Sequence, residues 1–221
     1  MALKIILGST SPRRHQLLRE VGYEFEYIKP ETEEIELKGE SPRKMVERLA
    51  TEKALDVFEQ VRSPLFTAVI LTADTTVVHP KGVGVLNKPT SVQEAERILK
   101  KIVGKTHSVL TAYVLVHVDA GEIKSFHPRI VQTRVKIKKL STHQIRNYIA
   151  SGEPMDKAGA YAAQGIGMSF IESIQGSYSN VVGLPMAELV DDFRELFQIE
   201  PTWNHSKVVT KKSKKKSKKS F

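Results

Sequence analysis

The sequence predicts an α/β or α+β domain built on a mixed β-sheet. Short apolar runs alternate with amphipathic helical runs in the first half of the chain, which indicates strands separated by helices. The run 68–72 is apolar and typical of a strand covered on both faces. Two long runs, 107–118 and 123–137, meet at Asp119-Ala120-Gly121-Glu122, which favours a hairpin. The 221 residues suffice for a sizeable core, as one large domain or two small ones.

The chain opens with a predicted strand, tight loop and helix. Residues 3–7 are apolar, residues 16–21 are amphipathic, and Gly8-Ser9-Thr10-Ser11-Pro12-Arg13-Arg14 lies between them. Gly8 permits a sharp turn, Ser11 suits the helix N-cap and Pro12 suits the first helical position. Free N–H groups at a helix start, beside hydroxyls and guanidiniums, suit a polyanion such as a nucleotide phosphate. The alternative is an ordinary helix cap with solvated arginines, and the loop alone does not decide between them.

The later elements follow the same periodicities. Ser41, Ser91 and Ser141 are expected to cap helices, and Gly22 is expected to end the first one. The remaining strands are expected at 23–28, 68–72 with 77–79 as a continuation, 107–118, 123–137 and 168–174, and the remaining helices at 42–60, 92–101, 142–150 and 185–197. The segments 30–40 and 176–183 are expected to be loops. Four glycines among the sixteen residues 152–167 indicate a backbone shaped around something.

Positive charge is concentrated at the C-terminus. Residues 207–221 contain eight lysines and no acid, so only +1 of the net charge of +9 belongs to residues 1–206. We therefore expect a folded domain at 1–200 and a disordered Lys/Ser-rich tail at 201–221. Such a tail can direct nuclear import, contact RNA or a membrane surface, or only increase solubility, and composition does not choose among these.

The composition also excludes several classes of protein. Without cysteine, the chain has no disulfide, thiol catalysis or cysteine-bound zinc. Its seven histidines show no metal-ligand spacing. No apolar run approaches the ~20 residues that span a bilayer, and the N-terminus has no signal-peptide pattern. We therefore expect a cytoplasmic protein with no membrane partner, or a nuclear one if the tail directs import.

Charged and polar residues at the ends of the expected elements make up a candidate site. The residues expected to hold phosphates are Arg13, Arg14, Lys53, Lys88 and Lys157. Asp74, with Glu33 or Glu34, can hold a metal or act as a base, and Gln164 can read a base edge because an amide both donates and accepts. Taken singly, Lys53 is better explained as a solvated lysine, and Lys88-Pro89 as a common turn. Asp74 differs, because an unpaired carboxylate at the end of a buried strand is costly.

Seven segments occur together in the order and spacing of one known family. They are GSTSPRR at 8–14, EKA at 52–54, ADTTVV at 73–78, NKP at 87–89, DKAGAY at 156–161, QG at 164–165 and GSYSNVVGLP at 176–185. Over residues 3–198 the chain thus resembles the Maf family of septum-formation-inhibitor-like nucleotide pyrophosphatases. Each segment alone is a weak signal, but jointly they are specific. Thr10 is a small departure, because the family often has glycine or serine there.

The resemblance implies hydrolysis of a nucleoside triphosphate to the monophosphate and pyrophosphate with a divalent metal (Mg²⁺, Mn²⁺ or Co²⁺). It implies catalysis by Asp74 with Lys53 and Lys88, and a metal held by Asp74 and by Glu34 in preference to Glu33. The residues it implies for substrate binding are Ser9, Ser11, Arg13, Arg14, Glu34, Thr75, Lys157 and Gln164. The pattern KAGAY…Q resembles the branch that acts on dTTP and UTP in a house-cleaning role, with Lys157 and Gln164 setting specificity.

The fold that the resemblance implies is the Maf/inosine-triphosphatase-like α/β fold. It has an elongated mixed β-sheet flanked by helices, two lobes with a central cleft, and frequent homodimers. The alternative function, from a different class, is a nucleic-acid-binding or regulatory protein that acts through the Lys-rich tail. A scaffold with a degraded site is less favoured, because the set of charged residues is complete.

Overall fold

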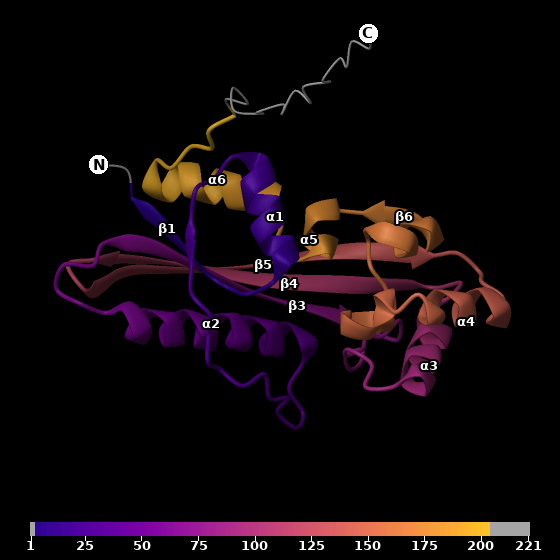
Figure 1. The fold of residues 1–221 in the computed structure, drawn as a ribbon. Coiled ribbons are helices and arrows are strands. Elements are labelled where there is room, and N and C mark those ends of the chain that lie inside the picture. Colours follow the sequence, from indigo (N-terminus) through magenta and orange to yellow (C-terminus); the bar gives the residue numbers. More distant parts are fainter. Residues whose placement is uncertain (1–2, 204–221) are drawn as a thin grey trace, which may run out of the picture.

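The computed structural model describes residues 3–203 and consists of one mixed six-stranded sheet flanked by helices (Figure 1). The strands are β1 (Lys4–Gly8), β2 (Glu26–Tyr27), β3 (Ala68–Val78), β4 (Thr106–Asp119), β5 (Glu122–Ile137) and β6 (Ile171–Gln175), in the spatial order β2-β1-β3-β4-β5-β6. β1 is parallel to both of its neighbours, and the pairs from β3 to β6 are antiparallel. The predicted mixed α/β architecture and the β4–β5 hairpin are therefore confirmed.

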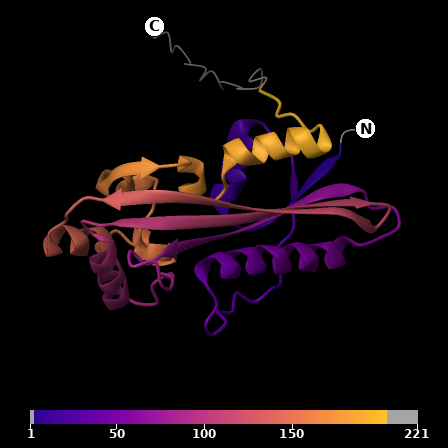
Figure 2. The same ribbon diagram turned by 180° about the vertical axis from the view of Figure 1, so that it is seen from behind.

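Helices cover both faces of the sheet. They are α1 (Pro12–Val21), α2 (Pro42–Val61), α3 (Val92–Ile102), α4 (Thr142–Ala150), α5 (Tyr178–Val182) and α6 (Met186–Phe197), with short 3₁₀ turns η1 (Glu153–Asp156), η2 (Ala158–Ala160) and η3 (Gly165–Phe170). α2 lies along one face near β1, and α1 and α6 lie on the other face (Figures 1 and 2). α3 and α4 lie together at the far end of the long strands (Figure 1). The body is therefore elongated, with helices gathered at both ends of β3–β5.

The alternation of side chains along β3 decides which face receives the polar residues. Val69 and Leu71 pack into the core beneath α1 and α6, whereas Ala68 and Ile70 pack into the core beneath α2. Thr72 continues the second set, and its Oγ1 donates to the carbonyl of Ala50 on α2 at 2.7 Å. The same alternation directs Asp74, two residues after Thr72, toward the next turn of α2.

The predicted helix caps are largely confirmed. The hydroxyls of Ser41, Ser91 and Ser141 each accept an N–H bond from the third residue after them. Gly22 ends α1 at φ +97°, a conformation that favours glycine. Ser11 occupies the N-cap position of α1 with Pro12 after it, but its side chain makes no capping bond.

Three segments differ from the sequence prediction. The expected strand 23–28 contracts to β2, because Tyr23 is drawn into the core by a backbone bond to Leu18 at the end of α1. The start of the expected strand 168–174 is the end of η3, so β6 begins at Ile171. The expected loop 176–183 contains α5, whose N-cap Ser177 accepts from the N–H of Asn180. β3 runs unbroken to Val78, as the proposed continuation requires.

Two predictions about the ends of the chain have different outcomes. Within residues 3–203, none of the helices combines the length and the apolarity required to traverse a bilayer. The Lys/Ser-rich run 207–221 lies outside the described residues. Of the expected tail, Pro201 is buried, and Thr202 donates to the carbonyl of Gly22 from both its N–H and its hydroxyl.

Candidate active site

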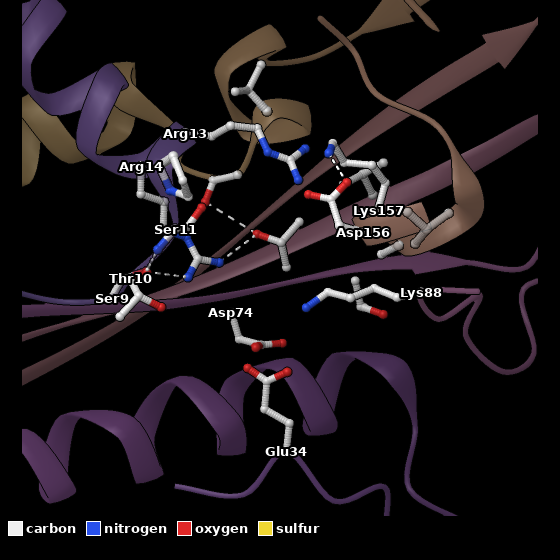
Figure 3. A pocket seen from close by; sticks show the side chains of 18 of the residues that line it. Ser9, Thr10, Ser11, Arg13, Arg14, Glu34, Asp74, Lys88, Asp156 and Lys157 are labelled. Carbon is white, nitrogen blue, oxygen red and sulfur yellow. Dashed lines mark hydrogen bonds and ion pairs between the residues drawn. The ribbon is translucent and has the colours of Figure 1, made fainter. Parts of the chain in front are cut away.

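A cavity of about 930 Å³ brings together segments from most of the chain (Figure 3). Its walls come from the loop 8–14, the middle of β3, the loop after β2, the loop before α3, and the turns η1 to η3. The sequence-predicted site residues that line it are Ser9, Ser11, Arg13, Arg14, Glu34, Lys53, Asp74, Thr75, Lys88, Lys157 and Gln164. Of the two acids left open, Glu34 lines the cavity and Glu33 is not among the lining residues.

Lys53 joins two carboxylates at one side of the cavity. Its Nζ donates to Oδ1 of Asp74 at 2.6 Å and to Oε1 of Glu34 at 2.5 Å. Lys53 is 6% exposed and Asp74 is 7% exposed, so this is a buried ion pair with a third, partly exposed member. Burial is the largest single influence and would raise the pKa of Glu34, but the charge and hydrogen bond of Lys53, with the charges of Lys88 and Arg14, together outweigh it and lower that pKa.

The register of β3 explains why Lys53 is buried. Asp74 follows Thr72 on the face that packs against α2, and Lys53 lies one helical turn beyond Ala50, the residue that Thr72 contacts. The sequence favoured a solvated lysine here, because the helix pattern alone does not reveal the carboxylate across from it. Strand and helix together therefore fix the Asp74–Lys53 pair.

The loop 8–14 is held from within. Ser9 is buried, and its Oγ accepts from the N–H of Ser11 at 3.2 Å and from Arg14 at 3.3 Å. A ring nitrogen of His15 lies 2.7 Å from the carbonyl oxygen of Ser9. Because Ser11 does not cap α1, the N–H groups of the first turn remain available to an anion.

The two arginines of this loop have different environments. Arg14 donates to the carbonyls of Ala73 at 2.8 Å and Gly183 at 2.9 Å, and to Oγ1 of Thr75 at 3.2 Å. Burial lowers the pKa of Arg14, against the opposing charge of Asp74. Within residues 3–203 the Arg13 side chain makes no hydrogen bond, and it extends into the cavity (Figure 3). The structure thus places Arg13 toward a ligand, whereas Arg14 braces the backbone on both sides of Asp74.

Thr75 is also engaged by the protein. Its Oγ1 accepts from Arg14, lies 3.0 Å from Oγ1 of Thr111, and is 3.3 Å from the carbonyl oxygen of Gly183. This hydroxyl therefore ties β3 to β4 and to the end of α5. It reaches a ligand only by exchanging one of these partners.

The opposite wall supplies two further lysines. Lys88 is exposed and extends toward Asp74 and Glu34, and its charge contributes to the lowered pKa of Glu34 (Figure 3). Lys157 pairs with its neighbour Asp156.

Gly159 has φ +71° and packs against Val77, where a side chain would overlap the valine. That close approach seats η2 on β3 beside the cavity.

Sequence reasoning missed three residues that shape the site. Asp156 pairs with Lys157, Asn87 donates to Glu36 across the cavity mouth, and Glu153 lines the cavity beneath the glycine-rich turns. Asn87 and Asp156 lie within the quoted segments 87–89 and 156–161 but were given no role there, and Glu153 lies outside every quoted segment. Glu153 in particular precedes a proline, which indicates a turn and says nothing of its contacts.

Two carboxylates suit a divalent cation that also binds phosphate oxygens. Within the described residues no group of three or more acidic or histidine side chains could hold a metal ion. Glu34 and Asp74 each give one oxygen to Lys53, which leaves their second oxygens for a cation. Mg²⁺ commonly takes one or two carboxylates, several waters and the substrate's phosphates, so the residues present fit such an ion.

Comparisons with known proteins identify the family to which the chain is similar. The family described as Maf-like protein matches residues 4–196. The dTTP/UTP pyrophosphatase of Shewanella sp. (strain MR-7) is 42% identical over 191 residues, which cover 84% of this chain and 94% of that protein. The dTTP/UTP pyrophosphatase of Vibrio cholerae serotype O1 is 44% identical over 185 residues, again 84% of this chain and 94% of that protein. The solved Staphylococcus aureus Ham1 protein superposes with a TM-score of 0.45 and 12% identity over 76% of this chain and 79% of that chain, a likeness too distant to carry weight.

Proposed function

Because this chain belongs to the Maf-like protein family, we propose that it is a nucleoside triphosphate pyrophosphatase that converts dTTP and UTP to the monophosphate and pyrophosphate. The observation that carries the proposal is the pairing of Asp74 and Glu34 around Lys53, in a cavity that also receives Arg13 and Lys88. A triphosphate is a small polyanion, and a local group of cations within a nearly neutral body suits it.

The reaction we propose is attack by water at the α-phosphorus. The bond from that phosphorus to the bridging oxygen breaks, pyrophosphate leaves with that oxygen, and Asp74 accepts the proton of the attacking water. Lys53 orients Asp74, because its Nζ contacts one carboxylate oxygen and leaves the second oxygen for the cavity. Arg13 and Lys88 stabilise the charge that develops on the leaving group.

Phosphate positioning falls to the loop 8–14 in this proposal. The free N–H groups at the start of α1 and the hydroxyl of Ser11 bind phosphate oxygens, as the positive end of a helix favours. Ser9 and Arg14 shape the loop through their contacts with other groups of the protein. Any direct contact that either side chain makes with the substrate adds to that role. Thr75 acts in the same way, through Arg14.

The metal belongs to the proposal as well. Asp74 and Glu34 would hold Mg²⁺, Mn²⁺ or Co²⁺, which neutralises phosphate charge and makes the phosphorus easier to attack. Lys157 and Gln164 lie on the cavity wall formed by η1 to η3 and would read the base. The cytoplasmic location remains the expectation drawn from the sequence. The homodimer rests on the family resemblance alone, and light scattering of the purified protein tests it.

A nucleotide panel tests the function. The purified chain with Mg²⁺, Mn²⁺ or Co²⁺ should release pyrophosphate from dTTP and UTP in preference to purine nucleotides. Asp74→Asn should lower kcat by about 10²–10⁴-fold, the range expected when a general base is lost. A folded protein that releases no pyrophosphate from any nucleotide overturns the proposal, and near-normal turnover in Asp74→Asn overturns the role of Asp74.

A further inference from the structure

The glycine-rich turns at one end of the cavity fold around a single carboxylate. Oε1 of Glu153 accepts from the hydroxyl of Tyr148 at 2.9 Å and from the N–H of Gly167 at 2.8 Å. Oε2 accepts from the N–H of Ile166 at 2.8 Å. The Tyr148 oxygen in turn accepts from the N–H of Ala162 at 3.2 Å. Both ends of the segment 162–167 are thus tied to Glu153, directly or through one tyrosine.

The glycines of this segment are required by that arrangement. Gly165 has φ +64°, and a Cβ there would overlap Oε2 of Glu153. A Cβ on Gly167 would lie 2.7 Å from the hydroxyl of Tyr148 and would overlap the carbonyl of Ala162. The sequence indicated that the backbone of the glycine-rich segment is shaped around something. In the structure, that something is the side chain of Glu153.

Glu153 remains ionised in this setting. Burial alone would raise its pKa, but the N–H groups of Gly167 and Ile166 and the hydroxyl of Tyr148 outweigh burial and lower it. With three donors already on its two oxygens, the carboxylate has little capacity left for a ligand. Its effect on a substrate must therefore pass through the segment that it holds.

Gln164 is the side chain at the centre of that segment, and it lines the cavity. Uracil and thymine present an N–H donor beside a carbonyl acceptor, whereas cytosine presents an acceptor beside an amino donor. One orientation of an amide complements uracil, and the opposite orientation complements cytosine. Selectivity between the two pyrimidines thus requires an amide that cannot turn over, and a rigid backbone on both sides of Gln164 supplies part of that restraint.

We propose that Glu153 is a positioning residue for base selection, which holds the segment 162–167 so that Gln164 favours uracil and thymine over cytosine. The inference rests on the proposed function, because it concerns the same cavity and the same reaction. It separates the cavity into two ends. Phosphate binding depends on the loop 8–14 and Lys88, whereas base selection depends on the Glu153 network.

Kinetics of Glu153→Gln test the inference. The amide keeps the size of the side chain but turns one acceptor into a donor that faces a backbone N–H. We expect KM for UTP to rise and the ratio of kcat/KM for UTP to that for CTP to fall, each by about tenfold, which is one well-made hydrogen bond. The inhibition constant of inorganic tripolyphosphate, which has no base, should stay within about twofold of wild type, since one lost base contact leaves phosphate binding intact.

Two further variants keep the test decisive if Glu153→Gln folds poorly. Tyr148→Phe removes the hydroxyl that donates to Glu153 and accepts from Ala162, but it leaves the N–H bonds of Ile166 and Gly167 to Glu153. Its UTP/CTP ratio should therefore lie between wild type and Glu153→Gln. The matched control is Glu172→Gln on β6, an exposed glutamate that pairs with Lys136, and it should leave every constant unchanged.

The outcomes separate the inference from the function it rests on. A wild-type chain that releases no pyrophosphate from UTP overturns the proposed function. If wild type is active and both Glu153→Gln and Tyr148→Phe keep the wild-type UTP/CTP ratio, the inference alone is wrong. If UTP binding and tripolyphosphate binding weaken together, Glu153 has a general structural role, and the inference is again wrong.

Discussion

At the scale of single residues, the ammonium of Lys53 balances two carboxylates that would otherwise repel each other. Asp74 and Glu34 each bond to the same Nζ, at 2.6 and 2.5 Å. Removing the lysine leaves the buried charge of Asp74 uncompensated, and such losses are far larger than those of surface pairs. Lys53 therefore matters both to folding and to the state of the proposed catalytic acids.

Lys53→Met should cost about 3 kcal/mol of unfolding free energy, the low end for a broken buried pair because Glu34 is half exposed. It should also lower kcat/KM by at least about 100-fold. Without Lys53, the pKa of Glu34 rises toward its ordinary value, so the acid limb of the pH–activity profile should move to higher pH. Urea denaturation and the pH profile measure these effects. Lys100→Met, which removes an exposed pair with Glu96, is the control and should change neither.

Only some of these residues could be assigned to the site from the sequence. Sequence reasoning identified Asp74, because a carboxylate on a buried strand needs a partner, but it placed Asp74 at the end of that strand, whereas β3 continues to Val78. It left Glu33 and Glu34 open, because both lie in a loop without periodicity, and the contact that distinguishes them is made with α2. Lys53 by itself was assigned to solvent, since its partner is supplied by β3, a separate element.

His107 is a second buried titratable residue, and its effect is on stability. Its side chain is 3% exposed and bonds to the hydroxyl of Tyr161 at 2.8 Å, and burial lowers its pKa to about 4. In the unfolded chain His107 binds a proton below pH ~6.5, whereas in the folded chain it does not until about pH 4. The free energy of unfolding should therefore fall as pH drops through this window.

The fall in the free energy of unfolding should be larger in wild type than in His107→Gln by up to about 3 kcal/mol. Denaturant unfolding at several pH values checks this, and a parallel loss in both proteins contradicts it. His143→Gln, at an exposed site, is the control.

At the scale of elements, the loop 30–40 owes its shape to α2. Arg48 donates to both carboxylate oxygens of Glu40, at 2.8 and 2.7 Å, and to the carbonyl of Ile35 at 2.9 Å. Asp56, two turns further along α2, accepts the N–H of Glu31 at 2.7 Å. The loop that carries Glu34 is thus anchored before and after that residue, which lets an irregular segment present a carboxylate at a fixed place.

Arg48→Gln should therefore loosen the loop and lower kcat/KM by about tenfold, equivalent to ~1.4 kcal/mol of transition-state binding. The kcat/KM of the metal-dependent reaction should decrease, because Glu34 shifts while Asp74 keeps its bond to Lys53. Arg62→Gln at the C-cap of α2 is the control, since Arg62 contacts only Glu59, at 3.7 Å, and the ring of Phe58 among the described residues and does not touch the loop. Equal kinetics in the two variants would show that the anchor does not position Glu34.

Elements with strong periodicity were predictable, and those set by tertiary contacts were not. β3, the β4–β5 hairpin and α2 follow from apolar patterns and serine caps. β2 is short because Tyr23 belongs to the core, and no local pattern shows that. The turn η3 depends on Glu153, and η2 depends on the contact of Gly159 with Val77, so their glycines could be noticed in the sequence but not explained.

At the scale of the molecule, the cavity joins the two ends of the folded chain. The loop 8–14 meets the carbonyl of Gly183 through Arg14, and α1 ends against Thr202. Periodicity could predict a mixed sheet but not this closure, because it depends on contacts across nearly the whole sequence. The order of the seven motif segments carried that information, since residues that serve one cavity are constrained together.

Removal of the Lys-rich tail tests whether the folded body alone carries the enzymatic activity. The cavity is made from residues between 8 and 183, and residues 1–206 carry a net charge of only +1. A chain that ends at residue 206 should therefore keep kcat and KM for UTP within about twofold of the full chain, because the lining residues among 3–203 all precede that point. Any affinity of the full chain for single-stranded RNA should be lost on this truncation.

In the full chain, that RNA affinity should fall steeply with salt. Eight lysines that all contact phosphates predict a slope of about −5 to −6 in log K against log salt. The control is a full-length chain with the eight lysines changed to glutamine, which should match the truncated chain in both assays. RNA binding that survives truncation with the same steep slope would place a polyanion surface on the body. The cavity lysines Lys53, Lys88 and Lys157 would then have to be tested for RNA as well as for nucleotide.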